Sequence, residues 1–159
     1  MTEELKACGD IAIGILSLRE RIGEEIAVSE WLEILQARIN QFGEATGDRQ
    51  WIHVDAARAS IESPFKTTIA HGFLTLSLVV PLFTEAVRLD GVRLAVNYGL
   101  NRVRFVAPVP AGSRVRARFT PLSVEDAAES VQVTWTVVVE REHGDKPCLV
   151  AEWIVRYYT

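Results

Sequence analysis

The sequence is poor in cysteine and has no excess of positive charge. Cys8 and Cys148 are its two cysteines, and they form no metal-ligand or redox spacing with each other or with the three histidines. We expect both to be small buried side chains in a reducing, cytoplasmic setting. The formal net charge of −4 offers no general attraction to phosphate backbones or anionic membranes, so we expect neither nucleic acid nor membrane as a partner.

Long apolar runs are also missing. The run at residues 11–18 is too short to span a bilayer, and the charged residues on both sides of it are unlike those of a signal peptide. It predicts an amphipathic helix instead. We expect residues 1–21 to form an N-terminal helical extension and residues 22–159 to form one domain, since 159 residues suit a single core.

Helical spacing is clear in two short segments. Residues 35–46 place apolar side chains on one face, and Gly47 is a typical C-terminal stop. Asp55 is a suitable N-cap for a second helix that runs to about Ile61, and Pro64 prevents this helix from continuing.

Residues 72–88 are apolar on nearly every side. A helix without a polar face belongs inside a domain, so the pattern predicts a buried central helix. Pro81 removes one backbone hydrogen bond from its interior, and we expect a kink near Leu78.

Most of the remaining chain alternates between apolar and polar residues with a period of two. The predicted strands are one or two within residues 26–35, one at 94–105 with a bulge near Asn101, and three at 114–119, 131–139 and 149–157. Turn signals lie between them, so we expect consecutive strands to be antiparallel neighbours. The fold class is therefore α+β, with an antiparallel sheet around the apolar helix. A second copy of the chain could cover what remains exposed.

Asp48 and His53 lie in one short loop. A carboxylate and a neutral imidazole can both accept a proton, and a water held between them could be activated by general acid/base catalysis. The alternative is a turn-forming Asp and a His packed against Trp51, and the two residues by themselves do not decide between these readings.

Gly72 stands at the start of the apolar helix. Free N–H groups lie at such a position, and a glycine lets a ligand approach the backbone, as in an oxyanion hole. The alternative is a glycine that only marks the helix start. We expect His71 to be structural. The Ser77 hydroxyl needs a partner, which is either the carbonyl four residues back or Asp48.

The stretch from Phe42 to Ser77 resembles the signature of the MaoC-like family of (R)-specific enoyl-CoA hydratases. That signature is an aromatic residue, G-D-x-N-P-hydrophobic-H, then I-x-H-G and a serine, and the matching positions are Phe42, Gly47, Asp48, Ile52, His53, Ile69, His71, Gly72 and Ser77. Gln50 and Trp51 depart from the N-P form and agree with the nodulation protein N-like subgroup.

The resemblance implies a hot dog fold over residues 22–159 and a homodimer with the active site near its interface. It also implies reversible syn addition of water to a trans-2-enoyl thioester of CoA or an acyl carrier, giving an (R)-3-hydroxyacyl thioester. Asp48 and His53 would activate the water, the Gly72 N–H would polarise the thioester carbonyl, and Ser77 and Gln50 would support them. No metal or redox cofactor is implied.

Less specific expectations concern the rest of the substrate. Trp51, Phe73 and Leu74 could line an apolar slot for the acyl chain. Arg102, Arg104 and Arg114 could meet CoA phosphates, although arginines on an exposed strand face are common without any ligand.

Two other functions share the expected fold. An acyl-CoA thioesterase would direct water to C1 of the thioester, but its usual helix carboxylate is absent between Gly72 and Thr84. A non-catalytic acyl-thioester binding or dimerisation module would leave Asp48 and His53 without a joint role.

Overall fold

The computed structural model describes residues 11–159, so Cys8 and the first part of the predicted N-terminal extension lie outside it. In chain order the elements are β1 (Ile11–Gly14), the 3-10 helix η1 (Ile15–Arg21), β2 (Ala27–Val28), β3 (Leu32–Ile34), α1 (Gln36–Thr46), α2 (Trp51–Val54), α3 (Ala56–Glu62), α4 (Gly72–Ser77), α5 (Val79–Ala86), β4 (Val87–Asp90), β5 (Leu94–Phe105), β6 (Ser113–Ala127), β7 (Ser130–Arg141) and β8 (Leu149–Tyr158).

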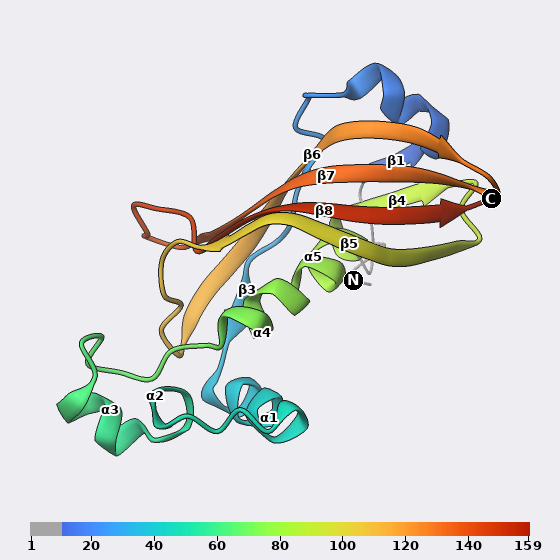
Figure 1. Cartoon of the computed structure of the whole chain (residues 1–159). Helices are drawn as coiled ribbons and strands as arrows, with labels where there is room; N and C mark the ends of the chain where they lie inside the picture. The colour runs from blue at the N-terminus through green and yellow to red at the C-terminus, as the bar shows by residue number, and fades with distance from the viewer. Residues whose placement is uncertain (1–10) are drawn as a thin grey trace, which may run out of the picture.

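One curved antiparallel sheet wraps around the helix pair α4–α5 (Figure 1). Its strand order is β2-β6-β7-β8-β5, with β3 also paired to β6. The α+β class and the sheet around a central helix are confirmed. The side chains of β7 and β8 alternate between the core and the outer face, which is why their period-two pattern was readable in the sequence.

Aromatic rings fill the core between sheet and helix. Phe83 of α5 meets Phe119, Trp135 and Trp153 edge-on, with ring centroids 5.0, 4.8 and 5.4 Å away. Trp135 also donates a hydrogen bond to the buried hydroxyl of Tyr157 at 3.0 Å. Edge-to-face packing of this kind stabilises a core beyond the area that it buries.

The helix expected at residues 11–18 is wrong for its first half. Ile11–Gly14 is a strand that pairs in parallel with β4, and only the residues after it form a 3-10 helix. Local spacing could not show this, because the partner strand lies more than seventy residues away in sequence. Ile13, Ile15 and Leu18 are buried in the same core as the sheet, so the described part of the predicted extension packs on the domain.

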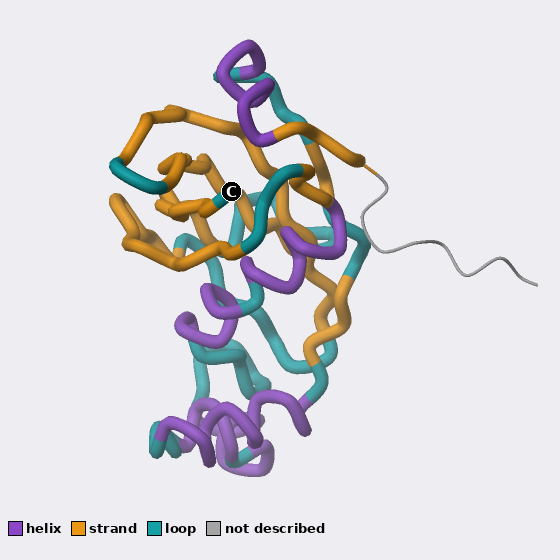
Figure 2. The backbone as a smooth tube through the Cα atoms, turned by 90° about the vertical axis from the view of Figure 1, so that its right-hand side faces the viewer, coloured by secondary structure: helices purple, strands orange, loops and turns teal. Residues whose placement is uncertain are grey.

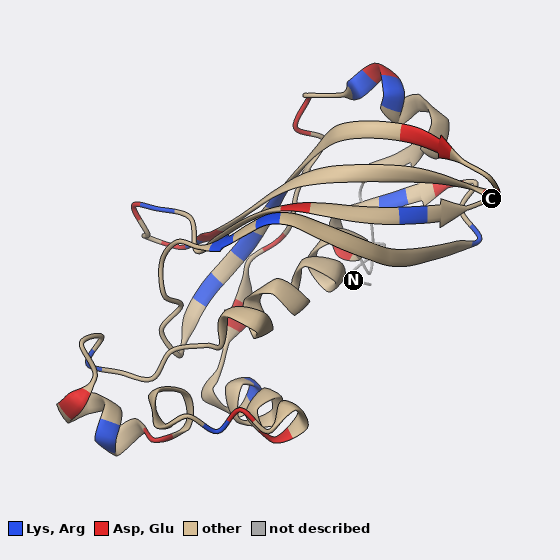
Figure 3. Cartoon of the chain, viewed as in Figure 1, with Lys and Arg blue, Asp and Glu red and all other residues tan. Residues whose placement is uncertain are grey.

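The kink near Leu78 is confirmed, because α4 ends at Ser77 and α5 begins at Val79. The helix ends at Ala86, two residues early, where β4 takes over. The expectation that it is buried on every side is wrong: Phe73 is 66% exposed and Val80 is also exposed. Residues 72–84 contain no Lys, Arg, Asp or Glu, and the ribbon of α5 is tan along most of its length (Figure 3).

Strand β5 also differs from expectation. The antiparallel order of β6, β7 and β8 is confirmed, but β5 pairs with β8 at the opposite edge instead of with β6. The expected bulge is present between Asn101 and Arg104, and a second lies between Asn97 and Gly99. The alternation within a strand does not encode which neighbour it takes, so sequence order was a poor guide here.

Helices α1 to α3 gather at the end of the sheet where α4 begins, as the side view shows (Figure 2). The predicted stop at Gly47 is confirmed by its left-handed φ of 79°. The predicted cap is confirmed by the Asp55 side chain, which accepts a hydrogen bond from the Arg58 N–H. No helix within residues 11–159 is long and apolar enough to cross a membrane.

Truncation of Phe83 tests the aromatic core. Phe83→Ala should lower the free energy of unfolding by about 3–5 kcal/mol, because it leaves a cavity among three rings. Urea denaturation measures this change. Ile61→Ala is the control, since Ile61 is exposed on α3 and should change stability by less than about 0.5 kcal/mol. Equal effects of the two substitutions would contradict this account of the core.

Candidate active site

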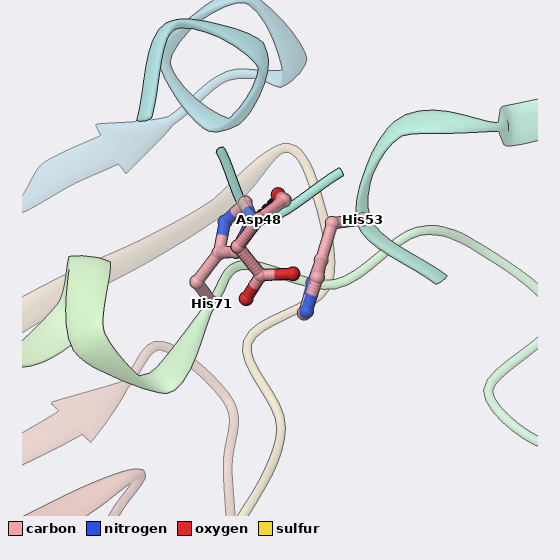
Figure 4. A group of neighbouring side chains, drawn as sticks. All are labelled: Asp48, His53 and His71. Atoms are coloured by element: carbon pink, nitrogen blue, oxygen red, sulfur yellow. Dashed lines mark hydrogen bonds between the residues drawn. The ribbon is translucent and has the colours of Figure 1, made fainter. Parts of the chain in front are cut away.

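Three polar side chains converge where helices α1 and α2 meet the start of α4. Asp48 comes from the loop after α1, His53 from α2 and His71 from the N-cap of α4 (Figure 4). One ligand-type atom from each lies within 4.8 Å of the others. Asp48 and His71 are 23 residues apart in sequence and are joined by a hydrogen bond, and next to His53 the Ile69 N–H donates to the Ile52 carbonyl at 3.1 Å.

The hydrogen bonds of His53 determine which of its nitrogens carries the proton. Its Nδ1 lies 2.7 Å from the Ile69 carbonyl, which can only accept, so Nδ1 carries the hydrogen and Nε2 has a free lone pair. The backbone is held as well, because Gln36 donates to the His53 carbonyl at 2.7 Å. The His53 ring and backbone are therefore both held in place, with Nε2 as the ring nitrogen that does not contact Ile69.

Asp48 offers its carboxylate to solvent. Its Oδ1 accepts a long hydrogen bond of 3.4 Å from the Gln50 N–H, and its backbone carbonyl accepts one from His71 Nε2 at 2.9 Å. A carboxylate oxygen of Asp48 and a ring nitrogen of His53 lie within 4.8 Å of each other, a separation that one water with two hydrogen bonds of about 2.8 Å can bridge.

Gly72 follows His71 and packs under the ring of Phe105. A Cβ at this position would lie 2.9 Å from Phe105 Cγ, closer than side chains tolerate. Among the described residues no group accepts from the Gly72 N–H, as expected for the first residue of a helix. The amide is thus available to a ligand.

Two clefts flank α4. The Gly72 cleft, of about 250 Å³, is bordered by Ile69, Gly72, Thr75, Phe105 and Cys148. The Ser77 cleft, of about 370 Å³, lies between the helix and β5 and is bordered by Ser77, Val80, Tyr98, Leu100 and Trp153. Both linings are mainly apolar, and burial raises the pKa of the Cys148 thiol, so this cysteine is a neutral wall group and not a thiolate.

Comparison with known proteins identifies the family of this chain. The family model of the MaoC-like domain matches residues 17–143. The chain belongs to the MaoC-like domain family. It is 51% identical over 144 residues to 3-hydroxyacyl-thioester dehydratase Z of Mycobacterium tuberculosis, which covers 90% of this chain and 95% of the relative. It is 44% identical to nodulation protein N of Rhizobium leguminosarum bv. viciae, with 89% of each chain covered.

Solved structures confirm the hot dog fold of this MaoC-like chain. A monoamine oxidase regulatory protein from Archaeoglobus fulgidus superposes with a TM-score of 0.74 at 23% identity, over 96% of this chain and 99% of that one. An (R)-hydratase from Pseudomonas aeruginosa gives 0.69 at 24% identity, over 86% and 81%. The family and its dehydratase relative also confirm the expected enzyme class, a hydro-lyase.

The supporting residues predicted from the sequence, Ser77 and Gln50, are not both near Asp48 and His53. The Ser77 hydroxyl donates to the Phe73 carbonyl at 2.7 Å, the local alternative, and Ser77 borders the other cleft. Gln50 is exposed, and its backbone N–H contacts Asp48. Within one MaoC-like chain, Ser77 therefore does not contact Asp48.

The predicted acyl-slot residues lie in different environments. Trp51 is partly buried, with the Arg58 guanidinium stacked 4.4 Å from its ring centroid. Phe73 is exposed and packs edge-on against Phe105, 5.8 Å between centroids. Leu74 is part of the hydrophobic core, so it does not line either cleft.

The predicted phosphate-binding arginines also differ from one another. Arg114 is paired with Glu142 at 3.0 Å on the outer sheet face. Arg102 has a positive φ of 51° in the bulge, an 84% exposed side chain and an ion pair with Glu152 at 3.7 Å. Arg104 is exposed and donates to the carbonyl of Val103. Arg102 and Arg104 therefore have guanidinium groups open to a ligand, whereas Arg114 does not.

The donor set Asp48, His53 and His71 does not fit a metal ion. A metal bound by two imidazoles lies in the plane of each ring at about 2.0–2.1 Å. The rings of His53 and His71 are stacked, with centroids 3.8 Å apart and planes inclined by only 24°. Their in-plane lone pairs therefore do not meet at such a short distance.

Two features of the site were not found from the sequence. The Ile69 carbonyl accepts a hydrogen bond from His53 Nδ1, and His71 contacts both Asp48 and His53. A backbone acceptor leaves no residue-type signal. His71 did carry a signal, since it stands in the I-x-H-G part of the motif, but its contacts depend on the fold.

Substitution of Gly72 tests the close packing at the helix start. Gly72→Ala should destabilise the protein by about 1–3 kcal/mol through the collision with the Phe105 ring. Thermal denaturation measures the change, and Phe105→Leu should relieve it in the double variant. Gly99→Ala is the control, because its new methyl group would meet only ordinary contact at 3.9 Å. A loss that persists unchanged in the double variant would contradict the proposed collision.

Proposed function

We propose that this chain is an (R)-specific enoyl-thioester hydratase, which adds water reversibly to a trans-2-enoyl thioester. The observation that carries this proposal is the convergence of the Asp48 carboxylate and the His53 imidazole across a gap that one water can bridge. The dehydratase relative and the (R)-hydratase neighbour support it.

In the proposed reaction, one water supplies both new substituents. His53 Nε2 takes one proton from the water while the Asp48 carboxylate accepts its other O–H, and the oxygen bonds to C3. The C2–C3 π electrons move toward the thioester carbonyl, whose oxygen the Gly72 N–H stabilises. The proton held by His53 then returns to C2 on the same face. Dehydration is the reverse sequence.

The two clefts suggest how the substrate lies. We assign the thioester group to the Gly72 cleft, because that cleft borders the free amide and the segment of Ile69 that holds His53. The acyl chain would occupy the Ser77 cleft beside the same helix. Arg102 and Arg104 are then available to the phosphates of a CoA carrier or to an acidic carrier protein.

A second copy of the chain would complete the structure. Strand β5 pairs with β8 on one side only, and it is exposed along almost its whole length. Its exposed apolar residues are Leu94, Val96, Tyr98, Leu100 and Phe105. Edge strands of this kind rarely stay uncovered, so we propose a homodimer along β5 that also closes the Ser77 cleft. The cytoplasmic location stays a prediction.

A thioesterase remains the alternative enzyme. Its usual carboxylate on the central helix is absent, because residues 72–84 contain no Asp or Glu. The lining of the Gly72 cleft adds only the neutral thiol of Cys148 and the hydroxyl of Thr75. The geometry therefore favours hydration over cleavage. A non-catalytic binding module would not need the His53 ring to be oriented by a hydrogen bond from Nδ1 to the Ile69 carbonyl.

A direct assay separates these functions. With crotonyl-CoA, the purified protein should remove the absorbance of the conjugated enoyl thioester without release of free thiol. Asp48→Asn and His53→Ala should each reduce the rate at least about 100-fold, the range of general acid/base groups. Asp145→Asn and His143→Asn are matched controls on an exposed loop. Thiol release by the wild type would replace the proposal with the thioesterase, and no reaction of either kind would leave the binding module.

The dimer has its own test. Val96→Glu places a charge on the exposed edge of β5, outside both clefts, and should convert a dimer to a monomer in light scattering coupled to size-exclusion chromatography. Leu16→Glu is the control, since Leu16 is exposed on η1 away from β5. A wild type that elutes as a monomer, or a Val96→Glu dimer, would argue against this interface.

A further inference from the structure

His71 is a buried histidine to which the proposed reaction assigns no chemical step. It is 2% exposed, and it lies at the N-cap of α4 directly before Gly72. Its ring packs against Phe42 of α1, with centroids 5.0 Å apart, and stacks on His53 at 3.8 Å. His71 thus lies between α1 and the imidazole of His53.

The hydrogen-bond partner of His71 shows which ring nitrogen carries a hydrogen. The Asp48 backbone carbonyl, 2.9 Å from Nε2, can only accept, so Nε2 carries the hydrogen. Nδ1 is buried and has no partner among the described residues. A second hydrogen there would be a buried charged donor without an acceptor, which is more costly than a bare lone pair. His71 therefore donates through Nε2 to the main chain of Asp48.

This bond holds a loop that has few other supports. The other hydrogen bonds of the Asp48–Gln50 backbone in the described structure are local. The N–H groups of Asp48, Arg49 and Gln50 donate to the Thr46 hydroxyl, the Gly47 carbonyl and the Asp48 side chain, respectively. The Gln50 carbonyl accepts from the His53 N–H. None of these reaches the element that carries Gly72. The His71 bond does, because His71 and Gly72 are adjacent residues.

The stack holds the second reacting group. The hydrogen bond to Ile69 determines which His53 nitrogen is protonated, but a single bond leaves the ring free to rock about it. The nearly parallel face of His71, inclined by 24°, restricts that motion. Among the described residues, His71 contacts both Asp48 and His53 while adjoining the free amide of Gly72.

We propose that His71 is a positioning residue of the hydration reaction, which sets the Asp48 main chain and the His53 ring relative to the Gly72 amide. The inference rests on the proposed function. A misplacement of about 1 Å can cost a reaction about 100-fold in rate, so a residue that touches no substrate can still control kcat.

Two amide variants isolate the hydrogen bond. The amide nitrogen of Gln matches the reach of His Nε2, whereas that of Asn is one methylene shorter. His71→Gln should keep the bond to Asp48 and lose only the ring stacked on His53, so kcat for crotonyl-CoA hydration should fall by no more than about five-fold. His71→Asn loses both contacts and should lower kcat about 10- to 100-fold at little changed KM. His71→Phe keeps a ring beside His53 but has no donor, and we expect it to fall with His71→Asn.

A second measurement does not depend on activity. Amide hydrogen exchange of Arg49 and Gln50, followed by NMR, should accelerate in His71→Asn and His71→Phe and stay near the wild-type rate in His71→Gln. If the Gln and Asn variants behave alike in exchange, or if kcat falls equally in both, the positioning role is wrong. An inactive wild type with the expected exchange pattern would reject the proposed function and leave the His71 support of the loop in place.

Discussion

An apolar helix that the sheet covers on one side only is the constraint on which the rest of this structure depends. Phe83 of α5 is held by three aromatic rings of the sheet, so the helix axis is set by the core. The start of α4 is then set too, and with it the position of His71 and Gly72. The uncovered side, with Phe73 and Val80, lies next to the exposed strand β5. One packing requirement therefore fixes the helix start and leaves an exposed apolar face beside β5.

The site combines rigid and open parts. His53 is fixed by a hydrogen bond to a backbone carbonyl and by a stacked ring, so the orientation of its imidazole is defined. Asp48 is exposed, and its carboxylate can hold a water without the desolvation that a buried charge would require. Gly72 contributes only its backbone, and its lack of a side chain lets Phe105 pack against the helix start. Each group thus has a different physical reason for its position.

Charge and apolarity are segregated in this chain. The arginines of β6 are paired with glutamates on the outer sheet face, for example Arg118 with Glu25 and Arg116 with Glu140. Near the end of β5, Arg102 is 84% exposed with Glu152 at 3.7 Å, and Arg104 donates only to the Val103 carbonyl among the described residues. A substrate that has an apolar tail and a charged carrier matches this division, because its two parts meet different surfaces of one protein.

The sequence by itself determined the elements that depend on local chemistry. The stop at Gly47, the Asp55 cap, the kink at Leu78 and the alternation in β6, β7 and β8 are each set by neighbouring residues. The motif also pointed to Asp48, His53 and Gly72. Tertiary structure alone decided that residues 11–14 pair with β4, that β5 lies beside β8 and that His71 joins Asp48 to His53. These contacts link residues far apart in the chain, and no local spacing encodes the partner that each will meet.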